Sequence, residues 1–141
     1  MHPYSYTVSL RANHPFRDLS YLGPLFSLER RFGWTAGAVP APELGPALGG
    51  VRNESYWSAR VTKERVSSDD QELEQTLERV ASDVIRLSDS LADFFATGGT
   101  LNFFVGVYGV GNFGLVFPIT VLQKLAAARI ELQLDIYPGE S

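Results

Sequence analysis

The stretch that decides the fold is residues 100–138, TLNFFVGVYGVGNFGLVFPITVLQKLAAARIELQLDIYP. Its apolar run over residues 101–108 predicts a strand. Pro118 predicts the start of a short helix, because proline is tolerated in the first helical turn and not further in. Residues 130–137 alternate apolar and polar side chains, which predicts a strand with one buried and one open face. The stretch therefore predicts a sheet that is covered on one side.

The glycine-rich segment of this stretch, Gly109-Val110-Gly111-Asn112-Phe113-Gly114, is a literal G-x-G-x-x-G. In a dinucleotide-binding fold the helix begins inside this motif and points its N–H groups at the pyrophosphate. Such a helix would hold Pro118 in its interior, where proline clashes with the preceding turn. We therefore interpret residues 109–112 as a hairpin turn and residues 114–117 as a short return strand paired with residues 101–108. Nucleotide or small-molecule binding at the Gly109 to Gly114 turn is the alternative; no cofactor is expected.

The rest of the chain supplies further elements. Residues 4–11 alternate as a half-buried strand. Asn13 is a candidate cap for a short helix ending near Leu22. Residues 25–34 are a weaker strand candidate, and residues 56–62 predict a further strand. The loop between Gly33 and Gly50 has no periodicity. Residues 69–96 carry one apolar stripe, which predicts a single long helix ended by Gly98-Gly99.

These elements predict an α+β fold in one domain over residues 1–141. A single sheet with its helices on one face fits the alternating first and last strands. The order resembles a ferredoxin-like β-α-β-β-α-β arrangement with a C-terminal extension of hairpin, helix and strand.

Several segments together resemble the uncharacterised bacterial domain of unknown function 4279 family. The resemblance covers nearly the whole chain except residues 38–50, and its most specific part is the ending. It implies a hairpin at the glycine turn and brings no activity or catalytic residues. The segments are Tyr6-Thr7-Val8-Ser9-Leu10, Trp34-Thr35-Ala36-Gly37, Tyr56-Trp57-Ser58, Phe104-Val105-Gly106, Asn112-Phe113-Gly114 and Leu132-Gln133-Leu134-Asp135-Ile136-Tyr137-Pro138.

Composition limits the function. The 141 residues include no cysteine, which excludes disulfides and thiol chemistry, and no apolar run approaches the length of a membrane span. The net charge is −4, with +3 over residues 1–66 and −7 over residues 67–141. Nucleic-acid binding is therefore not expected, although a local basic patch in the first half stays open. We expect a cytoplasmic protein without a membrane partner.

No set of residues in the sequence predicts catalysis or a metal site. His2 and His14 lack ligand spacing, and His14 is expected at the surface or as a helix cap. Asp135 on the last strand is expected to form a structural ion pair with Arg11 if the terminal strands are neighbours.

The sequence favours a non-enzymatic protein-interaction or inhibitor-like module, with a homodimer also open. Its binding surface is expected on the open sheet face and on the loop from Gly33 to Gly50, because aromatic side chains on a polar face indicate a partner, a second copy or a ligand. Tryptophan is also commonly buried, so the alternative prediction for Trp34 and Trp57 is a position in the core. The candidate surface residues are Arg11, Trp34, Trp57, Phe104, Tyr108, Gln133, Asp135 and Tyr137.

Overall fold

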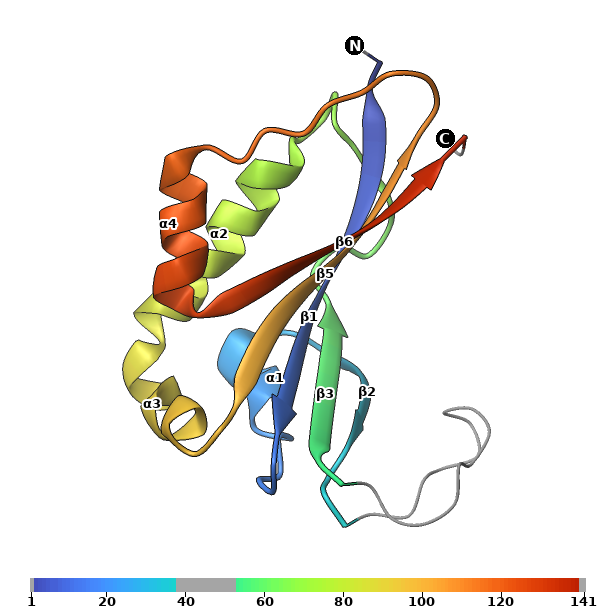
Figure 1. Ribbon diagram of the computed structural model, residues 1–141. Coiled ribbons are helices and arrows are strands. Elements are labelled where there is room, and N and C mark those ends of the chain that lie inside the picture. The colour runs from blue at the N-terminus through green and yellow to red at the C-terminus, as the bar shows by residue number, and fades with distance from the viewer. Residues whose placement is uncertain (1, 38–52, 140–141) are drawn as a thin grey trace.

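The computed structural model describes residues 2–37 and 53–139, so most of the loop predicted after Gly33 lies outside the described residues. This part of the chain forms a mixed sheet with helices, and the predicted α+β class is confirmed (Figure 1). The elements are β1 Tyr4–His14, α1 Leu22–Phe26, β2 Arg30–Trp34, β3 Ser55–Arg60, β4 Val66–Ser67, α2 Leu73–Arg86, α3 Ser88–Ala96, β5 Thr100–Gly109, α4 Ile119–Ala128 and β6 Ile130–Pro138.

The strands lie in the order β2-β3-β1-β5-β6, and the short β4 pairs with the start of β1. Neighbouring strands are antiparallel except β5 and β6, which are parallel and connected through α4. The described sheet thus holds more strands than the β-α-β-β-α-β pattern contains.

The predicted hairpin after β5 is wrong. Residues 113–118 belong to no helix or strand, and Pro118 is the N-cap of α4 with φ −57° and ψ 155°. The reason is long-range: β1 pairs with one edge of β5 and β6 with the other, so no edge remains for a return strand. Because β5 and β6 are parallel, the chain must cross over between them, and α4 makes that crossover.

One face of the sheet is buried under the helices. In β1 every second side chain from Tyr4 to His14 is buried, and Figure 1 shows α2, α3 and α4 on one side of the sheet. Helix α1 joins the same layer, because its Phe26 ring lies 5.8 Å from the ring of Trp57. Trp57 pairs in register with the buried Ala12 of β1, so both side chains point towards the helices.

Two helix predictions differ from the structure. The long helix is divided at Leu87, whose φ of −98° and ψ of 13° end α2 and begin α3. The short helix expected after Asn13 is displaced to Leu22–Phe26, since Asn13 still pairs with both Tyr56 and Thr100 and β1 continues to His14.

Candidate functional site

The face of the sheet that carries no helix is the candidate site, and we call it the open face. Opposite residues of paired strands share a face, so the register defines its membership. Ser9 lies between Arg60 and Phe104, and Phe104 in turn pairs with Gln133. The aromatic and basic members are Arg11, Phe32, Trp34, Tyr56, Arg60, Arg65, Phe104, Tyr108 and Tyr137.

Arginine side chains lie over aromatic rings along the middle of this face. The guanidinium carbon of Arg11 lies 3.8 Å from the centre of the Phe104 ring, and that of Arg65 lies 3.5 Å from the centre of the Tyr108 ring. Tyr137 stacks on Tyr108 with 4.9 Å between ring centres and 10° between their planes. Each cation–ring contact at a partly exposed site contributes about 0.5–1 kcal/mol, so these side chains hold one another in place.

Gly106 explains why the Tyr108 ring can lie close to the sheet. A Cβ atom at Gly106 would come within 3.0 Å of both the Thr7 hydroxyl and the Tyr108 hydroxyl. Any side chain here would push the ring outwards, so the shape of the open face depends on this glycine.

A second aromatic pair forms the other end of the open face. The rings of Trp34 and Tyr56 lie 4.8 Å apart, and the pair continues in register to Asn13 of β1. The open face therefore carries aromatic groups at both ends and an arginine–phenylalanine pair between them.

The structure places most of the predicted surface residues on one face. Trp34 and Arg11 share it with Phe104, Tyr108, Gln133, Asp135 and Tyr137. Trp57 does not belong to it: its side chain is 1% exposed and points into the core.

The expected pair between Arg11 and Asp135 is not formed among the described residues. Strand β5 lies between β1 and β6, so the two terminal strands are not neighbours. Arg11 is opposite Asn102, whereas Asp135 is opposite Gly106 and accepts a long hydrogen bond of 3.4 Å from the Tyr137 hydroxyl.

The aromatic and basic members that the sequence did not predict are Phe32, Tyr56, Arg60 and Arg65. Tyr56 was recoverable, because Tyr56 and Trp57 are adjacent in a strand and must point to opposite faces. Arg65 precedes the two-residue strand β4, which has no periodic pattern to reveal it. Its position over Tyr108 follows from the pairing of β4 with the start of β1.

The glycine turn is filled by side chains of the chain itself. A Cβ atom at Gly111 would meet the His2 ring at 2.6 Å, and one at Gly109 would meet the Phe113 ring at 2.5 Å. Beside Gly114 lies a pocket of about 320 Å³ whose lining includes Asp69, Glu72 and Glu74. A phosphate would meet both the rings and these carboxylates.

The carboxyl group of Glu74 in this pocket has a changed acidity. Burial, followed by the hydrogen bond and the charge of neighbouring Glu72, raises the pKa of Glu74 from 4.5 to about 7. The N–H of Val116 donates to the same carboxylate and partly offsets that increase.

We expect Glu74→Gln to stabilise the protein at pH 8 and not at pH 4. The folded state keeps the Glu74 proton up to about pH 7, whereas the unfolded chain releases it near 4.5. Wild-type stability therefore falls as the pH rises through this window, and glutamine removes that loss. Urea unfolding of both proteins across this pH range measures it, with the exposed Glu64→Gln as a charge-matched control. An equal effect of both substitutions at pH 8 would contradict the assignment.

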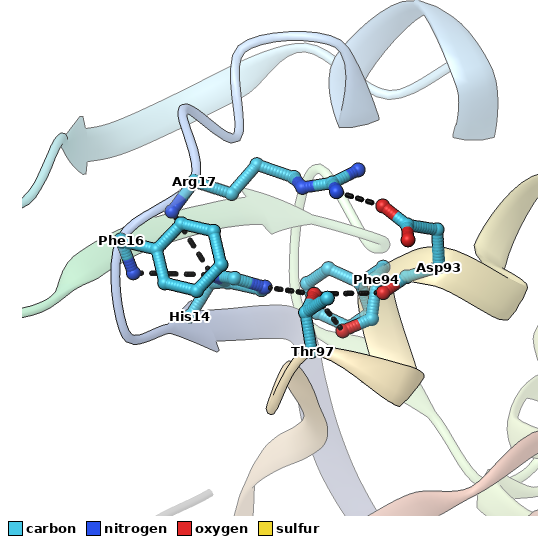
Figure 2. Close-up of polar contacts among 6 residues, drawn as sticks. All are labelled: His14, Phe16, Arg17, Asp93, Phe94 and Thr97. Atoms are coloured by element: carbon cyan, nitrogen blue, oxygen red, sulfur yellow. Dashed lines mark hydrogen bonds and ion pairs between the residues drawn. The ribbon is translucent and has the colours of Figure 1, made fainter.

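A second polar cluster joins the end of β1 to α3 (Figure 2). The buried His14 accepts hydrogen bonds at Nδ1 from the backbone N–H groups of Phe16 (3.1 Å) and Arg17 (2.9 Å). Its Nε2 donates to the Thr97 hydroxyl at 2.7 Å, and that hydroxyl donates to the carbonyl of Asp93 at 2.7 Å.

This cluster is structural. Because Nδ1 accepts two bonds, the imidazole is neutral with its proton on Nε2. Burial, followed by the charge of Arg17, lowers the pKa of His14 below its usual value. Arg17 also forms an ion pair with Asp93 above the ring. The expectation of a surface position for His14 is wrong, since its residue is fully buried.

Known proteins add no function to this geometry. Comparisons with protein-family models, curated proteins and solved structures found no match. Within residues 2–37 and 53–139, no helix is both long and apolar enough to cross a membrane. The same residues contain no group of three or more His, Asp or Glu side chains placed to hold a metal ion.

Proposed function

We propose that the chain is a non-enzymatic protein-interaction module, inhibitor-like in its action, that binds a partner protein on its open face. The observation that carries this proposal is the row of aromatic and arginine side chains across the sheet. Tryptophan, tyrosine and arginine are the residues most enriched where binding energy concentrates in protein interfaces, and lysine is depleted there. The row has no lysine and is held in place before binding by its own ring contacts.

The charges of the open face suggest the partner's chemistry. Arg11, Arg60 and Arg65 lie over its central strands, and the acids Glu131 and Asp135 lie on β6 at its border. A partner with carboxylates opposite the arginines would gain charge complementarity, which raises association rate and specificity. We therefore propose an acidic protein surface as the partner.

Other parts of the proposal rest on sequence alone. The loop from Gly33 to Gly50, of which residues 38–50 lie outside the described residues, is proposed to extend the binding surface. A ferredoxin-like arrangement of β1, β2, β3 and β5, membership of the domain of unknown function 4279 family and a cytoplasmic location stay predictions.

The alternative, a small-molecule or nucleotide site at the turn from Gly109 to Gly114, is less well supported. The rings of His2 and Phe113 cover two of its glycines, and the adjoining pocket is acidic. A thermal-shift panel of NAD, NADP, ATP, GTP and S-adenosylmethionine tests this alternative, because a ligand of the native state raises the melting temperature. A clear shift with any of them would favour this alternative over the open face.

We expect the double substitution Phe104→Ser and Tyr108→Ser to abolish partner binding while the protein stays folded. Both side chains are half-buried on the open face and outside the helix-covered core. Removing them takes away the rings on which Arg11 and Arg65 lie. Binding is measured by comparing the proteins that immobilised wild type and variant retain from a lysate of the source organism.

The matched control is Val116→Ser, which removes an apolar side chain that is 67% exposed beside α2, away from both the open face and the outer edge of β6. The control should retain the same proteins as wild type. Equal retention by the double variant, with an unchanged melting temperature, would show that the open face is not the binding surface.

A further inference from the structure

The two edges of the sheet are protected to very different degrees. Exposed edge strands usually carry charges, bulges or short lengths that prevent pairing with another chain. Strand β2 has these features: it is five residues long, begins with Arg30-Arg31 and has a register shift between Arg30 and Phe32. Strand β6 is less protected: its charged side chains are the acids Glu131 and Asp135, and its one proline is the last residue, Pro138. It is nine residues long, contains no lysine or arginine, and pairs with β5 in an unbroken register.

The outer side of β6 is also accompanied by exposed apolar side chains. Ile136 of β6 is 48% exposed, and Ile119 and Leu122 of α4 are 72% and 48% exposed. Residues three apart on a helix share a side, so Ile119 and Leu122 form one stripe. Lys124, about half a turn away, reaches Glu78 of α2 at 2.9 Å. The stripe therefore lies on the side of α4 turned away from α2.

We propose that β6 is a self-association edge, which pairs antiparallel with β6 of a second copy of this chain. The proposed two-fold axis passes through Leu134, the central residue of the strand. All nine residues then find a partner. On the helix face Leu134 meets Leu134 and Leu132 meets Ile136 of the other copy. On the open face Gln133 lies opposite Asp135 of the other copy, whose carboxylate can accept a hydrogen bond from the Gln133 amide. Glu131 lies opposite Tyr137.

Charge selects this register over its neighbours. Side chains alternate between the two faces along a strand, so residues that pair across the axis must point to the same face. The nearest alternative axes therefore pass through Gln133 or Asp135. The first would place Glu131 opposite Asp135 of the other copy, and the second would place the two Asp135 side chains opposite each other. Like charges directly opposite in a sheet are destabilising. The Leu134 axis also forms the longest ladder, because the other two leave two residues of each strand unpaired.

Such pairing also brings α4 helices of the two copies together. The axis is perpendicular to the sheet, so both helix layers lie on the same side, and α4 contacts β6 in each copy. Two strands span about 10 Å, which matches the distance of about 8–10 Å between packed helices. The stripe of Ile119 and Leu122 would then be covered. The two open faces would form one continuous surface on the opposite side.

The test uses sedimentation velocity of the full chain over a concentration series. Wild type is expected to form dimers as its concentration rises. Gln133→Asp places a carboxylate opposite Asp135 of the other copy at two symmetric positions and should weaken the dimer about tenfold. Gln133→Lys, at the same exposed site, places an ammonium group there and should preserve or strengthen it. A wild type that stays monomeric up to about millimolar concentration overturns the proposal.

Two substitutions together separate this register from an axis through Gln133. Gln133→Lys faces Asp135 of the other copy in the Leu134 register, whereas an axis through Gln133 would place two lysines opposite each other and weaken the dimer. Adding Asp135→Lys to Gln133→Asp restores opposite charges across the Leu134 axis and should recover the dimer. Leu122→Lys on α4 should also weaken the dimer, while retention of partner proteins by its monomer stays unchanged. Dimers that resist both Gln133→Asp and Leu122→Lys overturn the β6 edge as the interface.

Discussion

Replacing Trp57 by alanine is expected to lower the free energy of unfolding by about 3–5 kcal/mol, the usual cost of removing a large aromatic side chain from a core. Trp57 is 1% exposed and packs against Phe26 of α1. Among the described residues its indole N–H has no hydrogen-bond partner. The loss therefore comes from packing, and denaturant unfolding should show it without any change specific to partner binding.

Trp34→Ala is the matched control, because it removes the same side chain from the open face. Trp34 is half-buried and lies against Tyr56. We expect a stability loss of about 1 kcal/mol, the size of an aromatic pair interaction, together with a marked loss of partner binding. Equal stability losses in the two variants would show that the two tryptophans are not divided between core and surface.

The sequence could predict part of this division between core and surface. Strand alternation predicts which residues of β1 and β6 point to the open face. In the structure β1 keeps the alternation of burial over its full length, and β6 keeps it from Ile130 to Leu134. The same rule places Tyr56 and Trp57 on opposite faces, but it does not say which of them is buried. The position of α1 decides that, and α1 was predicted several residues too early.

The glycine turn is a case in which the local sequence does not determine the backbone conformation. Gly109 to Gly114 suits a hairpin as well as a crossover, because glycines allow both backbones. The outcome depends on which strands pair with β5, and that pairing involves β1 from the other end of the chain. The division of the long helix at Leu87 has a similar origin, since no proline or glycine marks it in the sequence. Pro118 was informative because its restriction is local.

The environment of His14 also could not be predicted from its neighbours in sequence. Its ring lies against Phe94, with 5.7 Å between ring centres, and bonds to Thr97 more than eighty residues away. The chain turns directly after β1, and His14 accepts the N–H groups of Phe16 and Arg17 that the turn leaves unpaired. A histidine at a strand end has no sequence signature for this role.

We expect His14→Ala to cost about 2–5 kcal/mol of unfolding free energy. It leaves two backbone donors without an acceptor, at about 1–3 kcal/mol each when they are buried, and opens a space beside Phe94. His14→Asn is the informative comparison. Its Oδ1 can replace Nδ1 as the acceptor for Phe16 and Arg17, while the bond to Thr97 is lost. We therefore expect His14→Asn to be milder than His14→Ala.

Wild type and His14→Asn together test the charge state of His14. The unfolded chain binds a proton at His14 near pH 6.5, but the folded state resists it because Nδ1 faces two N–H donors. The unfolded state thus holds more protons below pH 6.5, and stability is lost as the pH falls from there through the lowered pKa of the folded state. An asparagine amide cannot titrate, so His14→Asn should lack this loss.

Glu74 changes the stability with pH in the opposite direction, so both proteins should also carry Glu74→Gln in this comparison. Urea unfolding at pH 8, 7, 6 and 5 measures the difference, and parallel curves for the two proteins would contradict a neutral, doubly accepting His14.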